Sequence, residues 1–327
     1  MHVDRRLLGW GLFFIIVGTI ALATRAGVLD PALVRGWVTL WPLLLVAWGI
    51  GLVLRRTRLD WLGGAAAAVV LGLMGGGLLA TGFSGGAFSA GCGSQTPGTA
   101  FATQQGTAAA TTTMNVDFNC GILTLQAADG PTWSVSGTET RGDAPDIRTE
   151  GASVTIASKD HGSFFGAGGR RTDWTVVVPR SPVTNLGITI NAGQSTGNLE
   201  GANLGDVALT VNAGSAWMDL SHAAALGGLR ATVNAGSGTI VMPFDARAAS
   251  LSLNAGSMNL CLAAATPLRL AWSGALGSNN LDASGLTKVD ANTWQSTSFN
   301  PVSSFLDLRV TANAGSFRLD TDGTCDA

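Results

Sequence analysis

The sequence predicts a membrane-anchored protein in two parts: about three transmembrane α-helices, then an all-β domain folded as a single-stranded parallel β-helix (β-solenoid). Two observations predict this. Only 12% of the 327 residues are charged, and residues 61–116 contain no charged side chain. The C-terminal part repeats Asn-Ala-Gly at intervals near 21 residues, which sets the expected coil length. We therefore expect transmembrane helices within 1–82, a flexible Gly/Ala/Ser/Thr linker at 83–113 and a β-solenoid at 114–327.

Three apolar runs near the N-terminus have the length of a membrane span. They comprise 7–24, 37–54 and 62–80, with 18 or 19 residues each and no charge. As helices they would be roughly 27–28 Å long, close to the hydrocarbon thickness of a bilayer. Only a helix satisfies its own backbone polar groups in lipid, so helices are expected despite the glycines, with the Gly/Ala-rich third run giving the weakest signal. A signal peptide cleaved near "ALAT" at 21–24 is the alternative for the first run.

Basic residues predict the orientation of these helices. Arg5 and Arg6 precede the first run, and "RRTR" at 55–58 separates the second run from the third. The positive-inside rule places both in the cytoplasm. We therefore expect a multi-pass protein of a bacterial plasma membrane, with the bilayer as a partner and the C-terminal domain extracytoplasmic. Gly72 and Gly76 form a G-x-x-x-G pattern that favours helix packing within the chain or self-association between copies.

The β-solenoid is predicted from the spacing of the repeated tripeptide. Its Asn residues are 21, 22, 20 and then 59 positions apart. The last interval is interpreted as about three periods, one of them filled by a degenerate copy, "WSGALGSNNL" from Trp272. An early copy, "FNCGILTL", begins at Phe118. A period near 21 with alternating apolar residues is typical of one coil per repeat.

The repeated tripeptide itself predicts a corner. The last inward apolar residue before Asn and the first after it are five apart, as in Val211 and Ala216, whereas one flat strand keeps inward residues an even number apart. Asn tolerates the left-handed region and Gly enters it freely. Stacked coils would bring the Asn side chains roughly 4.8 Å apart, close enough for an amide ladder. We assign this structural role to Asn191, Gly193, Asn212, Gly214, Asn234, Gly236, Asn254, Gly256, Asn313 and Gly315.

No catalytic, cofactor or metal site is predicted. The three His show no nucleophile–base or metal-ligand spacing, and Asn-Ala-Gly-Ser supplies no carboxylate for a calcium repeat. Asp219 and Asp320 occupy equivalent outward positions, but we expect them five coils or roughly 24 Å apart. Paired acid–base work needs ~5–10 Å, so we expect a protein that is not an enzyme. Four cysteines are free or disulfide-bonded, with the pairing left open: Cys92, Cys120, Cys261 and Cys325.

One loop is a candidate for contact with a partner or a membrane. The segment "GSFFGAGGRR" carries Phe164, Phe165, Arg170 and Arg171 among glycines. A plain insertion is the alternative interpretation. Residues 114–327 have a net charge of −6 and the first 113 residues +4, which argues against nucleic acid as a partner.

Two resemblances carry functional expectations. Residues 5–58, with "RRLLGWGLFFIIVGTIALATRAGVLD" and "WPLLLVAWGIGLVLRR", resemble the LiaI–LiaF-like transmembrane region. The "NAGS" coils of 114–327 resemble toast-rack and auto-transporter adhesin-type domains of unknown function. These resemblances imply a cell-envelope protein, such as an accessory of an envelope-stress two-component system. The chain departs from the LiaF pattern because it shows three spans instead of four.

Three functional hypotheses follow. The first is a non-enzymatic bacterial cell-envelope membrane protein, an accessory or sensor of envelope stress, whose external β-solenoid binds a partner such as a membrane sensor protein. The second is a membrane-anchored adhesin or glycan-binding stalk whose partner is a cell-wall glycan. A carbohydrate-active β-helix enzyme is the third and has the least support.

Overall fold

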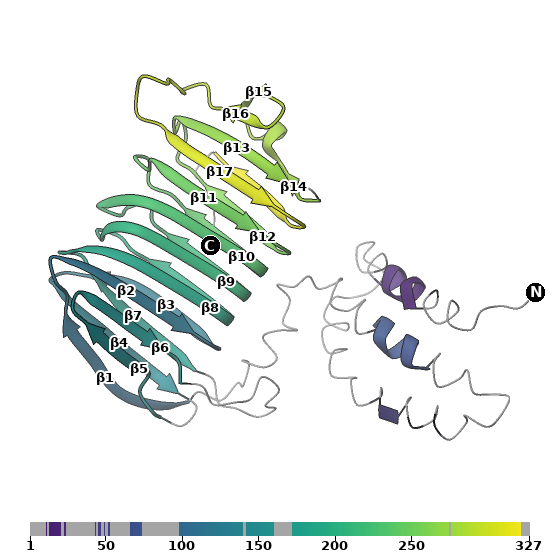
Figure 1. Ribbon diagram of the computed structural model, residues 1–327, viewed down its shortest axis with the longest axis horizontal. Coiled ribbons are helices and arrows are strands. Elements are labelled where there is room, and N and C mark those ends of the chain that lie inside the picture. The colour runs from purple at the N-terminus through teal and green to yellow at the C-terminus, as the bar shows by residue number, and fades with distance from the viewer. Residues whose placement is uncertain are drawn as a thin grey trace, which may run out of the picture. The chain divides into compact units, whose positions relative to one another are not determined.

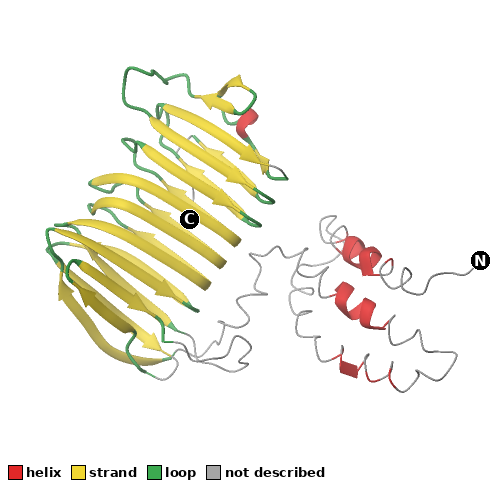
Figure 2. Ribbon diagram, in the orientation of Figure 1, coloured by secondary structure: helices red, strands yellow, loops and turns green. Residues whose placement is uncertain are grey.

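A computed structural model describes residues 11, 13–20, 23, 43, 45–46, 49, 52, 66–73, 98–139, 142–159, 172–274 and 276–321. The chain divides into two compact units, Met1–Ala87 and Phe88–Ala327, and each is considered by itself. Figures 1 and 2 show short helical segments in the first unit and a large stack of strands in the second.

The first unit corrects the prediction of transmembrane helices at 7–24, 37–54 and 62–80. Its described helical residues lie mainly in two runs of eight, 13–20 and 66–73. No helix in the described part of the chain combines the length and the apolar character needed to cross a bilayer. This finding also overturns the predicted multi-pass location in a bacterial plasma membrane.

The second unit is built from strands. Its described residues include one short 3₁₀ helix, η3 (Leu281–Ala283), and eighteen strands, which are β1 Thr99–Thr107, β2 Thr111–Phe118, β3 Ile122–Ala128, β4 Thr132–Glu139, β5 Asp146–Glu150, β6 Ser153–Ala157, β7 Asp173–Pro179, β8 Val183–Asn198, β9 Asn203–Asp219, β10 Ala225–Val241, β11 Ala248–Leu253, β12 Ser257–Cys261, β13 Leu268–Gly274, β14 Ser278–Asn279, β15 Thr287–Asp290, β16 Thr293–Gln295, β17 Leu306–Ala312 and β18 Ser316–Asp320. Strand β1 lies within the segment 83–113 that was expected to be a flexible linker.

Each coil has two arms that meet at the Asn-Ala-Gly motif. The first arm contains, in stacking order, β6, β2, the N-terminal parts of β8, β9 and β10, and then β11, β17 and β13. The second arm contains β7, β3, the C-terminal parts of β8, β9 and β10, and then β12, β18 and β14. These neighbours are parallel, and strands β8 to β10 continue through the motif (Figure 1).

The sheet is mixed, which corrects the predicted single-stranded, all-parallel β-helix. At one end of the stack β5 pairs with β6, β4 with β7 and β1 with β4, all antiparallel. At the other end β16 pairs with β13 and β15 with β16, again antiparallel. These antiparallel strands lie over coils that would otherwise present open edges, the usual cause of unwanted strand pairing.

The order of the coils in space differs from their order in the chain at both ends. The β2–β3 coil lies between β6–β7 and β8, although it precedes both in sequence. The β17–β18 coil lies between β11–β12 and β13–β14. Asn254 and Asn313 are therefore one step apart in the stack, so the interpretation of the 59-residue interval as about three successive periods is wrong. The degenerate copy from Trp272 does form a coil, β13–β14, whose Ser278 aligns with Ser316 and, through it, with Ser257.

The core lies between the two arms. In β8 the buried residues Leu186, Ile188 and Ile190 alternate with half-buried residues, as expected for strands with one face in a core. Across the motif of β9 the buried positions Val211 and Ala216 are five apart, with half-buried residues between them. The inward face of the second arm therefore begins anew after each motif.

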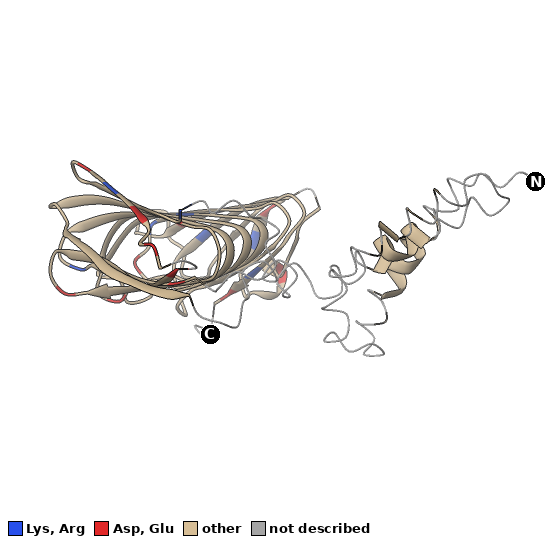
Figure 3. Cartoon of the chain, turned by 90° about the horizontal axis from the view of Figure 1, so that it is seen from below, with Lys and Arg blue, Asp and Glu red and all other residues tan. Residues whose placement is uncertain are grey.

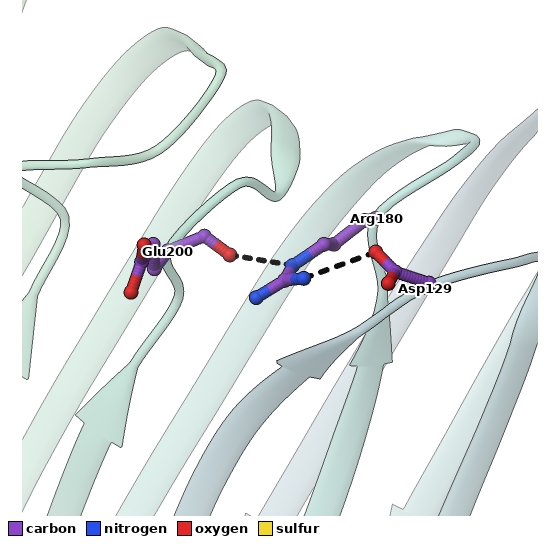
Figure 4. A network of polar contacts seen from close by, with 3 residues as sticks. All are labelled: Asp129, Arg180 and Glu200. Carbon is purple, nitrogen blue, oxygen red and sulfur yellow. Dashed lines mark hydrogen bonds and ion pairs between the residues drawn. The ribbon is translucent and has the colours of Figure 1, made fainter.

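Arg180 joins three coils at the turns that follow the second arm (Figure 4). Its Nε donates to the carbonyl oxygen of Glu200 at 2.7 Å, and its Nη1 lies 3.0 Å from Oδ1 of Asp129. Asp129 follows β3, Arg180 follows β7 and Glu200 follows β8. Because the stacking order is β7, β3, β8, the guanidinium spans the place where chain order and stacking order diverge.

Candidate functional site

The Asn residues of the motif form a continuous ladder of amide hydrogen bonds. In each step Nδ2 donates to Oδ1 of the neighbouring coil, at 2.6 to 2.9 Å, in the pairs Asn191–Asn119, Asn212–Asn191, Asn234–Asn212, Asn254–Asn234 and Asn313–Asn254. An amide within the ladder uses its oxygen on one side and its nitrogen on the other. These side chains therefore hold coils together.

The conformational reason given for Asn at the corner is wrong. Among the described residues, Ala265 is the only non-glycine residue with a positive φ. The motif Asn residues are therefore outside the left-handed region, and hydrogen bonding between coils explains their presence.

The glycines of the motif are required by the close approach of neighbouring backbones. A Cβ on Gly193, Gly214 or Gly236 would collide with the carbonyl oxygen of the glycine one coil before it. At Gly193, a φ of 111° adds a conformation that other residues rarely adopt. The Asn and Gly residues of the motif thus make contacts with neighbouring coils of the same protein.

The side chain of the residue after each motif glycine is not engaged in such contacts with other described residues. In-register pairing places five serines in a row along the second arm, which we call the serine ladder: Ser215, Ser237, Ser257, Ser316 and Ser278. Gln194 occupies the same position in β8. The serines are half-buried or exposed, and within the described part of the chain no hydrogen bond engages their hydroxyl groups. Four steps of about 4.8 Å make the ladder ~19 Å long.

A second outward row runs beside the serine ladder. Pairing aligns Thr196, Trp217 and Thr239 on β8, β9 and β10, followed by Asn259 on β12. Trp217 is half-buried, and every other aromatic residue of the described strands is buried. The Nε1 of Trp217 is buried without a hydrogen-bond partner, so the solvent-exposed part of the indole is carbon surface.

The surface around Trp217 carries little charge. From β8 to β12 neither the serine ladder nor the Trp217 row contains a charged residue. The nearest carboxylate along β9, Asp219, accepts hydrogen bonds from the backbone N and the Oγ of Ser221 at 2.9 and 2.6 Å. Figure 3, which looks at the stack from below, shows charged residues sparsely scattered over the second unit. Uncharged hydroxyl and amide groups around one aromatic surface thus define the candidate site.

The structure also locates the two aspartates considered for catalysis. The register runs from Asp219 through Val241 and Cys261 to Asp320, which is three steps, or ~14 Å, and not five coils. That separation still exceeds the ~5–10 Å of paired catalytic carboxylates. No group of three or more His, Cys, Asp or Glu residues in the described ranges is placed to hold a metal ion.

Other predicted features are only partly within the described residues. Cys120 and Cys261 are disulfide-bonded, whereas Cys92 and Cys325 lie outside the described residues. The candidate contact loop with Phe164, Phe165, Arg170 and Arg171 also lies outside them.

Sequence reasoning missed the serine ladder and Trp217, although the signal was present. Ser follows Asn-Ala-Gly in four of the five copies, so the serine is nearly as regular as the motif itself. Trp217 stands two residues after Ser215, which places both side chains on the same face of the strand.

Comparisons with known proteins give similarity to solved structures only. No family model matches the chain, and no curated protein matches it. A structure described as a "putative cell adhesion protein" from Clostridium sporogenes aligns with 12% identity and a TM-score of 0.43, covering 67% of this chain and 98% of that one. Structures described as "putative adhesin" from Bacteroides fragilis and Parabacteroides distasonis align with 6% and 14% identity, TM-scores of 0.29 and 0.26, 67% and 68% of this chain, and 96% and 97% of theirs. None of these matches bears on the LiaI–LiaF-like resemblance.

Proposed function

We propose that the second unit is a non-catalytic adhesion module that binds a glycan through the outer face of its second arm. The observation that carries the proposal is Trp217, which exposes indole carbon between Thr196 and Thr239 on an uncharged strand surface. The serine ladder runs alongside.

The chemistry of this surface matches that of a sugar ring. One face of a pyranose presents C–H groups, which pack on an aromatic ring, while its hydroxyls need donors and acceptors at the edge of that contact. Serine and threonine hydroxyls supply both roles and rotate to suit the partner. Because these hydroxyls have no partner within the described protein, a ligand need not break internal hydrogen bonds.

The other two hypotheses have no comparable support. The envelope-stress role rests on residues 5–58, most of which lie outside the described residues. The enzyme hypothesis needs two close carboxylates, and Asp219 and Asp320 are ~14 Å apart.

The test is binding of the purified full-length chain to immobilised β-1,4-linked N-acetylglucosamine oligomers, neutral sugars related to cell-wall glycan. We expect Trp217→Ala to weaken binding at least tenfold and Trp217→Phe to retain most of it, because phenylalanine keeps an aromatic surface. Ser252→Ala, an outward serine of the first arm, is the matched control and should bind like the parent chain.

Thermal unfolding of every variant is measured in parallel, so that loss of binding is separated from loss of fold. Equal binding by the parent chain and Trp217→Ala would overturn the proposal, as would absence of binding by the parent chain.

A further inference from the structure

We propose that the partner is a neutral, linear glycan that lies along the stack, parallel to the serine ladder, with successive sugars on successive coils. This inference rests on the proposed function and adds the ligand's charge, shape and direction.

The proposed direction of the glycan follows from the direction in which the serine hydroxyls repeat. Along the stack, the same hydroxyl recurs at every coil from Ser215 to Ser278, in steps of about 4.8 Å. A polymer with a repeating set of hydroxyls can make the same contact at each step. A single sugar would engage one or two coils and leave most of the ladder unused.

Across the stack the surface does not repeat. On the corner side of the serine ladder lies the Asn ladder, whose amides are already bonded to one another. On the far side of the Trp217 row, the aligned positions are Asn198, Asp219, Val241 and Cys261, which share no chemistry. A glycan crossing the strands would leave the hydroxyl rows after about one sugar, so the long axis of the ligand follows the stack.

The charge of the ligand follows from the side chains beside the rows. No charged residue lies within them between β8 and β12, so a charged sugar would have no counter-ion there. An anionic polymer would also pass Asp219, and further along Asp320, in the adjoining row. Arg318, in the Trp217 row at β18, is the only basic residue among the described positions of the two rows. Neutral hydroxyl and amide groups are therefore the best match.

The length of the ladder limits the length of ligand that gains affinity. Sugars within ~19 Å can reach a serine, and sugars beyond that distance cannot. Affinity should therefore rise with oligomer length and then stop rising.

The experiment titrates the full-length chain with β-1,4-linked N-acetylglucosamine oligomers of increasing length by calorimetry. We expect Kd to fall several-fold with each added sugar until the oligomer spans ~19 Å, and then to stay constant. The double variant Ser237→Ala/Ser257→Ala should flatten this dependence while leaving the disaccharide affinity within about twofold of the parent, because Trp217 and Ser215 remain. Ser237→Thr/Ser257→Thr should restore the dependence, because threonine keeps the hydroxyls.

The outcomes separate this inference from the function on which it rests. Binding that is abolished by Trp217→Ala but does not depend on length would overturn the linear arrangement and leave glycan binding intact. Loss of length dependence in the control Ser252→Ala would overturn the assignment to the serine ladder. Tighter binding of de-acetylated (cationic) or carboxymethylated (anionic) oligomers of the same length would overturn neutrality.

Discussion

The Nδ2 of Asn313 donates to the Oδ1 of Asn254 at 2.7 Å, although 59 residues separate them in the chain. At the opposite end of the stack, Asn191 donates to Asn119 at 2.9 Å across 72 residues. Both contacts exist because a coil from near each end of the second unit is inserted one position inward. The amide ladder therefore joins the inserted coils to the regular coils of β8 to β10.

Asn234 tests how much the ladder contributes to stability. Replacing it with alanine removes the bond it donates to Asn212 and the bond it accepts from Asn254. Half-buried Asn212 and exposed Asn254 then lose a partner, so we expect Asn234→Ala to lower the free energy of unfolding by ~1–2 kcal/mol. Urea unfolding followed by circular dichroism measures this change. Thr232→Val, outward on the same strand, should change it by less than about 0.5 kcal/mol, and an equal loss in both variants would contradict a specific role for the ladder.

Gly236 tests whether close backbone approach explains the glycine column. Its added Cβ would meet the carbonyl oxygen and nitrogen of Gly214, which are backbone atoms that cannot rotate away. We expect Gly236→Ala to destabilise the second unit by at least about 2 kcal/mol, or to prevent its folding. Gly238, two residues later in β10, is the matched control, because its Cβ would meet nothing closer than 3.4 Å. Gly238→Ala should unfold within about 1 kcal/mol of the parent chain, and similar losses in both variants would contradict the argument.

Some of this architecture could be predicted from the sequence, for identifiable reasons. The regular spacing of Asn191, Asn212 and Asn234 indicates one coil per repeat, and in-register pairing makes their side chains neighbours. The five-residue step from Val211 to Ala216 indicates where the inward face of the second arm begins. Both are local patterns, repeated with each coil.

What could not be predicted depends on non-local pairing. Spacing alone does not give the order in which coils stack. The interval between Asn254 and Asn313 contains the coil β13–β14 and the strands β15 and β16, yet the β17–β18 coil lies directly beside β11–β12. The length of the N-terminal apolar runs is also a poor indicator of transmembrane helices, because a run without charges sets only the longest helix that it could form. The candidate site at Ser215 and Trp217 could not be predicted, because each residue is informative only beside its neighbours on adjacent coils.

Cys120 and Cys261 are both disulfide-bonded, so we expect neither to have a free thiol in the folded protein. Denatured without reductant and treated with iodoacetamide, the chain should show neither cysteine alkylated by peptide mass spectrometry. Both should become alkylated once a reductant is added. Alkylation of either cysteine before reduction would contradict the structure at that position, and the peptides linked before reduction would identify the bonded pairs.

Arg180 offers a test of how the inserted β2–β3 coil is held. Its ion pair with Asp129 is worth little, because the Asp129 side chain is 91% exposed and water screens it. The bond from Nε to the carbonyl oxygen of Glu200 is shorter, 2.7 Å against 3.0 Å, and its acceptor is a backbone atom fixed by the neighbouring coil, so less side-chain freedom is lost in forming it. We expect Arg180→Gln to lower the free energy of unfolding by ~1–2 kcal/mol and Asp129→Ala by less than about 0.5 kcal/mol. Urea unfolding of both single variants and the double variant measures the coupling. The double variant should match Arg180→Gln, whereas equal losses in the two single variants would assign the stabilisation to the ion pair instead.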